Sequence, residues 1–167
     1  MLVLAKKYRD EIQFAFKPHH LLKYKLIQLW GADRVEAYYQ TWKDMDNTQL
    51  EESGYEDLFI GSDAMVHDSG SFVTEYLYVD KPVMFLLSDS MSQANYHTFG
   101  KMAFDNHYKG RSIEDIERFI NDVVLKGDDP MKASRKDFYT NYLVPQDGLL
   151  PSQKIMRVIE DYIATAN

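Results

Sequence analysis

The pattern of apolar and polar positions predicts short buried strands that alternate with amphipathic helices. Apolar runs of strand length occupy residues 12–16, 64–67 and 83–87, and a further short strand is expected at 48–52. Helical spacing of apolar residues predicts helices at 2–9, 21–30, 32–45, 55–60, 72–78, 112–127, 130–142 and 151–166. Strands that alternate with helices are typical of βαβ units, so the predicted class is α/β with a short parallel sheet flanked by helices.

Residues 64–89 contain the clearest strand, turn, helix and strand unit. Its turn is Asp68-Ser69-Gly70-Ser71, directly before the expected helix. Backbone N–H groups at the positive end of a helix bind anions, and Gly70 allows close approach of the backbone. The turn therefore predicts a site for a nucleotide diphosphate. The alternative is a capped helix after a buried strand, since helix caps of this composition are common.

Two further segments carry local structural signals. Ser112, with Asp115 three residues later, predicts a capping box at the start of a helix. The polar segment 90–108 is interrupted by Gly100 and is interpreted as a partly helical connection over the ligand edge of the sheet.

Composition narrows the possible functions. The length of 167 residues and a hydrophobic content of 45% predict a single folded domain over residues 1–167. The net charge of −7 argues against non-specific nucleic-acid binding, which requires a basic face. The absence of cysteine excludes disulfides and thiolate metal sites and fits a cytoplasmic location. The apolar run near Met1 is too short for a signal peptide or a membrane span.

Basic residues follow the strand at 12–16, where open α/β sheets place ligand sites. His19 is the candidate catalytic residue, because a histidine titrates close enough to neutrality to protonate or hydrogen-bond a leaving phosphate. A lone histidine is more often structural, and His20 competes with it. Lys17 would neutralise phosphate charge or lie along the sheet edge. His67, at the end of its strand, would line the ligand cleft or simply pack in the core.

Three segments resemble the C-terminal half of the CDP-glycerol glycerophosphotransferases, the teichoic acid polymerase family. They are KPHH at 17–20, YEDLFIGSDAMVHDSGSFVTEYLYVDKPVMFL at 55–86 and DGLLPSQKIMRVIEDYI at 147–163. The family's Arg/Lys-x-His motif is matched by Lys17-Pro18-His19. The family also has an Asp-x-Ser-Ser motif that is followed, four residues on, by an acidic residue. Residues 68–71 and Glu75 match this motif, except that Gly70 stands where the family has its first serine.

The resemblance implies a GT-B fold, in which two Rossmann-like domains face each other across a cleft. Residues 1–167 would then be the single donor-binding domain, with the N-terminal acceptor domain absent. The implied reaction transfers glycerol phosphate from a CDP-activated donor to a cell-surface polymer, at the inner face of the plasma membrane and with peripheral membrane association. Ser69, Gly70 and Ser71 would hold the diphosphate and Glu75 the ribose, with His19 as the catalytic residue and Lys17 and His67 as secondary contacts. No cofactor, metal or nucleic acid is expected, and this domain alone is expected to be inactive.

Two alternatives stay open. Residues 68–75 also resemble the Asp-Ser-Gly-Gly-x-x-Glu-Glu motif of the UDP-N-acetylglucosamine 2-epimerases, whose second Glu falls on Glu75. The chain would then be the UDP-sugar-binding half of a GT-B glycosyltransferase or of a 2-epimerase-like enzyme. The second alternative is a non-catalytic interaction domain that keeps the Rossmann-like frame without a ligand.

Overall fold

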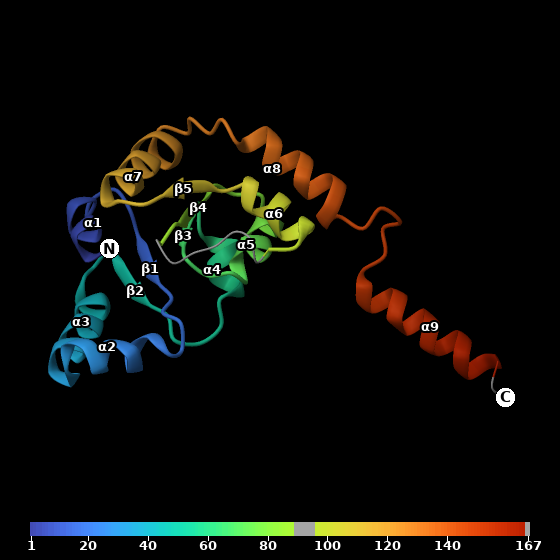
Figure 1. The fold of residues 1–167 in the computed structure, drawn as a ribbon, viewed down its shortest axis with the longest axis horizontal. Coiled ribbons are helices and arrows are strands. Elements are labelled where there is room, and N and C mark those ends of the chain that lie inside the picture. Colours follow the sequence, from blue (N-terminus) through green and yellow to red (C-terminus); the bar gives the residue numbers. More distant parts are fainter. Residues whose placement is uncertain (89–95, 166–167) are drawn as a thin grey trace. The chain divides into compact units, whose positions relative to one another are not determined.

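The computed structural model describes residues 1–88 and 96–165. The chain forms two compact units, residues 1–62 and residues 63–167 (Figure 1). Both contain short parallel strands flanked by helices, which confirms the predicted α/β class and is consistent with a Rossmann-like domain. The prediction of one donor-binding domain over the whole chain stays a prediction.

The N-terminal unit is built on a two-stranded parallel sheet. Its elements are α1 (Leu2–Lys7), β1 (Phe14–Phe16), α2 (Leu22–Trp30), α3 (Ala32–Asp44), β2 (Thr48–Leu50) and α4 (Glu56–Gly61). The ring of Phe16 lies 4.9 Å from that of the buried Trp42, which joins β1 to α3. The buried amide of Asn47 donates to the carbonyl oxygens of Ala5 and Ile12, so β2 is tied to the segments before β1.

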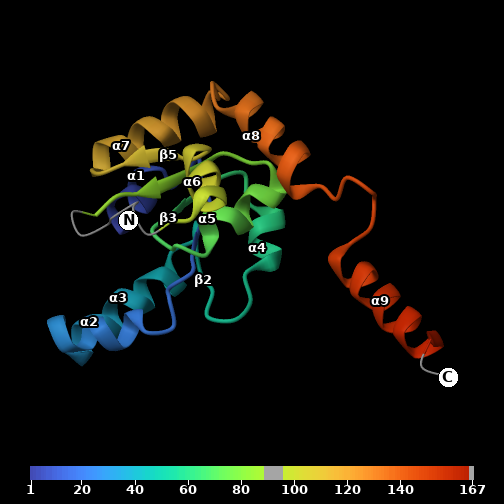
Figure 2. The same ribbon diagram turned by 45° about the vertical axis from the view of Figure 1, so that its right-hand side comes forward.

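The C-terminal unit contains a three-stranded parallel sheet with the order β3-β4-β5. Its strands are β3 (Met65–His67), β4 (Val83–Leu86) and β5 (Tyr108–Gly110). Its helical segments are α5 (Phe72–Glu75), the 3₁₀ helix η1 (Tyr76–Val79), α6 (Thr98–Asp105), α7 (Ile113–Arg118), η3 (Phe119–Leu125), α8 (Lys132–Phe138), η4 (Tyr139–Leu143) and α9 (Pro151–Thr165). α5 contacts α6, and α7 lies beside β5 in both Figure 1 and Figure 2.

The central strand β4 is buried and has a parallel neighbour on each side. Val83, Met84 and Phe85 are at most 3% exposed, as expected for a strand with neighbours on both sides and helices on both faces. His67 in β3 pairs with Phe85 in β4, and Phe85 pairs with Lys109 in β5. Because all three strands are parallel, the chain leaves β3 and β4 at the same edge of the sheet.

The predicted elements differ from the observed ones in three places. The helix expected at 72–78 is α-helical only to Glu75 and continues as η1, which ends at Asp80 with a left-handed φ of 54°. The helices expected at 112–127 and 130–142 end in the π-helical segments η3 and η4, where the Lys126 N–H bonds to the Asn121 carbonyl, five residues back. The predicted connection over 90–108 contains α6 and ends at Tyr108, where the unpredicted strand β5 begins, and its residues 90–95 lie outside the described part. The capping box of Ser112 and Asp115 is confirmed.

A buried polar cluster joins β5 to α8. The Tyr108 hydroxyl donates to the Asp129 carboxylate at 2.7 Å, and the Arg135 guanidinium forms a bidentate pair with the same carboxylate. Burial raises the pKa of Tyr108 to about 12. Burial also acts to raise the pKa of Asp129, but the hydrogen bonds from Arg135 and Tyr108 outweigh it and the pKa is lowered. The carboxylate is therefore charged and paired at neutral pH.

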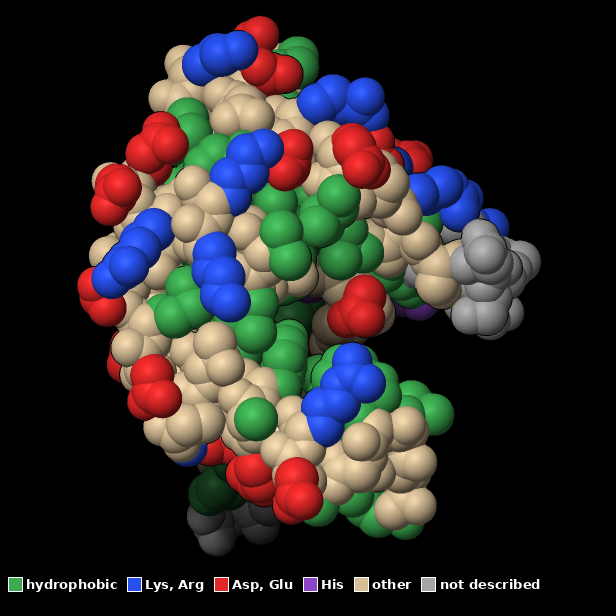
Figure 3. Space-filling view, turned by 90° about the vertical axis from the view of Figure 1, so that its left-hand side faces the viewer, with side chains coloured by type: hydrophobic (Ala, Val, Ile, Leu, Met, Phe, Trp, Pro, Cys, Tyr) green, Lys and Arg blue, Asp and Glu red, His purple; other side chains and the backbone are tan. Residues whose placement is uncertain are grey.

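The surface shows no strong segregation of charge on the face drawn in Figure 3. Among the described residues there, Lys and Arg side chains are interspersed with Asp and Glu rather than gathered into a continuous basic patch. Within residues 1–88 and 96–165, no helix has both the length and the apolar character needed to cross a membrane.

Candidate functional site

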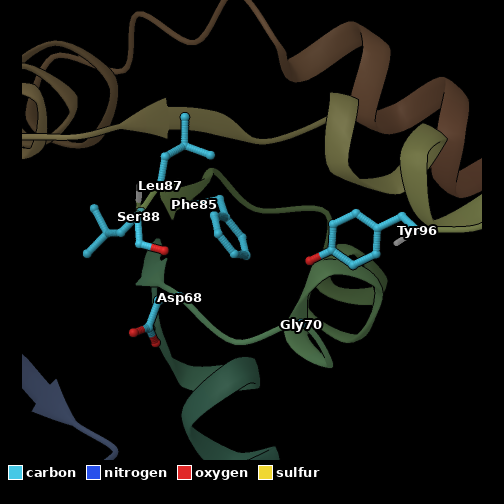
Figure 4. A pocket seen from close by; sticks show the side chains of 7 residues that line it. Asp68, Gly70, Phe85, Leu87, Ser88 and Tyr96 are labelled. Atoms are coloured by element: carbon cyan, nitrogen blue, oxygen red, sulfur yellow. The ribbon is translucent and has the colours of Figure 1, made fainter. Parts of the chain in front are cut away.

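A cavity of about 340 Å³ opens where β3 and β4 end (Figure 4). The carboxyl edge of a parallel sheet is where open α/β folds place their ligands, because successive loops converge there. Seven residues from the turn after β3, from β4 with the residues after it, and from the segment before α6 line the cavity. They are Asp68, Gly70, Phe85, Leu86, Leu87, Ser88 and Tyr96.

The turn predicted to bind a diphosphate lies between β3 and α5, beside this cavity. Gly70 lines the cavity, and Ser69 and Ser71 flank it in sequence, with Ser71 exposed at the N-cap of α5. Ser71 already has helical dihedral angles, φ −65° and ψ −42°, and its side chain makes no capping hydrogen bond. The first N–H groups of a helix have no acceptor within the helix. The turn therefore does not have the geometry of a helix capped by its own serine.

Glu75 is the last residue of α5, one helical turn after Ser71. Its side chain is half-buried, and it is not among the residues that line the cavity. Asp68, the first residue of the turn, is exposed and lines the cavity. The structure thus brings Asp68 and Gly70 to the cavity and leaves Glu75 outside it.

His67 is a packed residue of the core. Its side chain is 8% exposed, and its ring centroid lies 5.0 Å from that of Phe85 and 5.3 Å from that of His107. Its Nδ1 lies 3.1 Å from the Ser69 carbonyl oxygen, which can only accept, so Nδ1 carries the proton. Burial lowers the pKa of His67 to about 4. At neutral pH the uncharged ring therefore holds the backbone of the turn and does not line the cavity.

Lys17 and His19 lie on the loop after β1, in the N-terminal unit. The Lys17 ammonium donates to the Ser53 carbonyl oxygen. His19 is exposed, its ring lies 4.1 Å from that of His20, and its Nδ1 accepts the Leu21 N–H at 3.1 Å. Because Nδ1 is the acceptor, the neutral ring carries its proton on Nε2, where it can donate to a phosphate oxygen.

Sequence reasoning missed five residues of the cavity, namely Phe85, Leu86, Leu87, Ser88 and Tyr96. Ser88 follows β4 as Asp68 follows β3, so the pairing of these parallel strands would have placed the two residues near one another. Phe85 was expected in the core and not in a site. Tyr96 carried no signal beyond its position in a polar connection, and its placement depends on contacts with α6.

The electrostatics of the cavity are set by one carboxylate. The described residues that line it include Asp68 and no lysine or arginine. Among the described residues, the lining therefore offers a phosphate group no cation. Among residues 1–88 and 96–165, no group of three or more histidine or acidic side chains is arranged to hold a metal ion.

Comparison with known proteins identifies the family over nearly the whole chain. The family model described as CDP-glycerol:poly(glycerophosphate) glycerophosphotransferase matches residues 2–161. No curated protein and no solved structure gives a significant match. The match covers the loop after β1, the turn at residues 68–71 and the cavity behind it. The chain therefore belongs to the CDP-glycerol:poly(glycerophosphate) glycerophosphotransferase family.

Proposed function

We propose that residues 1–167 are the C-terminal half of a GT-B-fold glycerophosphotransferase and bind its CDP-activated donor. The observation that carries the proposal is the cavity at the carboxyl ends of β3 and β4, bordered by a glycine-containing turn whose serine does not cap its helix. Membership of the glycerophosphotransferase family supplies the reaction class. Strand-end cavities in α/β sheets support the location.

The proposal assigns a role to each site residue. The N–H groups and hydroxyls of Ser69, Gly70 and Ser71 bind the diphosphate, and Glu75 accepts hydrogen bonds from the ribose hydroxyls. His67 acts indirectly, because its bond to the Ser69 carbonyl holds the turn. In the N-terminal unit, Lys17 supplies positive charge and His19 donates from Nε2 to the leaving phosphate.

The proposed transfer is a displacement at phosphorus. A hydroxyl of the acceptor polymer attacks the phosphorus next to the glycerol and loses its proton to water. A new P–O bond forms, and the bond to the bridging oxygen breaks. The electron pair stays on that oxygen, and CMP leaves as negative charge grows on its phosphate. Hydrogen bonds from the turn N–H groups and from His19 to this charge would lower the barrier electrostatically. The donor is a substrate, so the proposal invokes no cofactor or metal. A lipid-linked acceptor and a location at the inner membrane face belong to the same proposal.

Isothermal titration with CDP-glycerol tests the assignment. We expect the 167-residue chain to bind, and the Ser71→Ala, Glu75→Ala double variant to bind about 100-fold more weakly or worse, because each change removes a hydrogen bond that involves a charged group. The matched control is a Ser134→Ala, Glu114→Ala double variant on α8 and α7, away from the cavity. It should bind as the unchanged chain does.

The same titration separates the alternatives. Tighter binding of UDP than of CDP would favour a UDP-sugar-binding half, which the match of residues 68–70 to the 2-epimerase motif supports. No binding of either nucleotide would refute the donor-binding role and favour a non-catalytic interaction domain.

A further inference from the structure

The lining of the cavity is chemically different from that of a phosphate site. It contains one carboxylate (Asp68), two hydroxyl groups (Ser88 and Tyr96) and an apolar wall formed by Phe85 with the two leucines that follow it. Phosphate sites offer Arg, Lys or converging N–H groups. A phosphate inside the cavity would face the negative charge of Asp68 without a cation among the described lining residues.

Tyr96 forms one end of the cavity. In Figure 4 its hydroxyl points into the cavity, on the side where Gly70 lies. A Cβ added at Gly70 would lie 3.8 Å from the Tyr96 hydroxyl oxygen, so the glycine leaves open space beside that hydroxyl. The Tyr96 side chain packs closely against α6. A Cβ added at Gly100 would lie only 3.3 Å from the Tyr96 Cβ, and the ring centroids of Tyr96 and Phe104 are 5.8 Å apart. Burial raises the pKa of Tyr96, so the hydroxyl remains a proton donor at neutral pH.

The other end of the cavity is formed by Asp68 and Ser88. These residues follow the neighbouring strands β3 and β4, and Figure 4 shows them on the opposite side of Phe85 from Tyr96. A carboxylate has two oxygens that accept and none that donates, so it matches a group with several hydroxyls. Donors and acceptors at both ends of an apolar wall suit an uncharged, hydroxyl-bearing group.

We propose that this cavity binds the uncharged polyol part of the donor, with Tyr96 donating a hydrogen bond to it and Asp68 accepting from its hydroxyls. The inference rests on the proposed function and adds the orientation of the bound donor. The phosphates lie at the turn, and the polyol extends from the turn into the cavity. The ribose is assigned to Glu75, which lies outside the cavity, so the polyol placed in the cavity is the glycerol.

Two substitutions in the full 167-residue chain test the inference by titration with CDP-glycerol. Tyr96→Phe removes only the hydroxyl and is expected to weaken binding about 3- to 10-fold, the effect of one neutral hydrogen bond. Tyr78→Phe, at a residue 55% exposed in η1, is the matched control and should bind as the unchanged chain does. Asp68→Asn removes the charged acceptor and is expected to weaken binding as well. Thermal unfolding of each variant checks that the fold is retained.

Whether Asp68→Asn weakens or tightens the binding of CDP-glycerol decides whether the cavity holds a polyol or a phosphate. Loss of a negative charge would tighten binding if a phosphate occupied the cavity, so tighter binding would overturn the inference. Unchanged binding by Tyr96→Phe would also overturn it. Titration with CDP, which lacks the glycerol, tests this placement: a Tyr96→Phe loss seen only with CDP-glycerol supports it, and an equal loss with CDP would overturn it. Failure of the unchanged chain to bind CDP-glycerol would instead refute the proposed function itself.

Discussion

Replacing Arg135 with methionine is expected to lower the free energy of unfolding by about 3–5 kcal/mol, the effect of breaking a buried ion pair. The Arg135 side chain is 1% exposed and that of Asp129 is 9% exposed. The substitution keeps most of the buried volume but leaves the Asp129 carboxylate without its bidentate partner. The Tyr108 hydroxyl would be its remaining side-chain donor among the described residues. Denaturant unfolding followed by circular dichroism measures the change.

Two matched variants separate the buried pair from salt bridges in general. Arg118→Met breaks the exposed pair with Asp115 in α7 and is expected to change stability only slightly, because water screens exposed pairs. An Arg135→Met, Asp129→Leu double variant removes both charges and should regain much of the lost stability. Equal effects of Arg135→Met and Arg118→Met would contradict the structural role assigned to the cluster.

Acidification below pH 6.5 is expected to destabilise the protein through two buried histidines. Burial lowers the pKa of His67 to about 4, and burial together with the nearby His67 ring lowers the pKa of His107 to about 3. Above pH 6.5 both rings are neutral in the folded and unfolded states, so their contribution is fully present. Between pH 6.5 and 4 the unfolded state binds protons that the folded state does not. The free energy of unfolding therefore falls by about 1.4 kcal/mol per pH unit for each ring as the pH decreases.

Substitution of the histidines isolates this contribution from that of the carboxylates. A His67→Asn, His107→Asn double variant keeps a donor close to the Ser69 and Ala103 carbonyls that the Nδ1 atoms contact. Its stability is expected to depend less steeply on pH between 6.5 and 4. The exposed pair His19→Asn, His20→Asn serves as the control and should keep the steep dependence. Parallel curves for the unchanged chain and the His67, His107 variant would show that the buried rings do not titrate as described.

Much of the fold was predictable because periodicity is a local property. The apolar strands β1, β3 and β4 and the paired helices α2 and α3 were found close to their observed bounds. β5 was missed because Tyr-Lys-Gly has no apolar run, and its strand conformation depends on pairing with β4. The π-helical ends of α7 and α8 were likewise not predicted, because the spacing of apolar residues does not distinguish them from an α-helix.

The candidate site was predictable only in part, for the same reason. The turn at residues 68–71 is contiguous in sequence, so its residue types indicated an anion site directly. Tyr96 and Ser88 reach the cavity from separate segments, and the Asp129–Arg135 pair joins α8 to the preceding loop. The role of His67 also required the structure, since only the bond to the Ser69 carbonyl and the burial of the ring distinguish a packed residue from a cleft residue.

The most direct test of the central claim is a crystal structure of the chain soaked with CDP-glycerol. We predict electron density for the diphosphate against the turn, with phosphate oxygens about 3 Å from the backbone nitrogens of residues 69–71. The polyol should extend toward Tyr96 in the cavity. Density for the diphosphate at another surface, with none at the turn, would contradict the account.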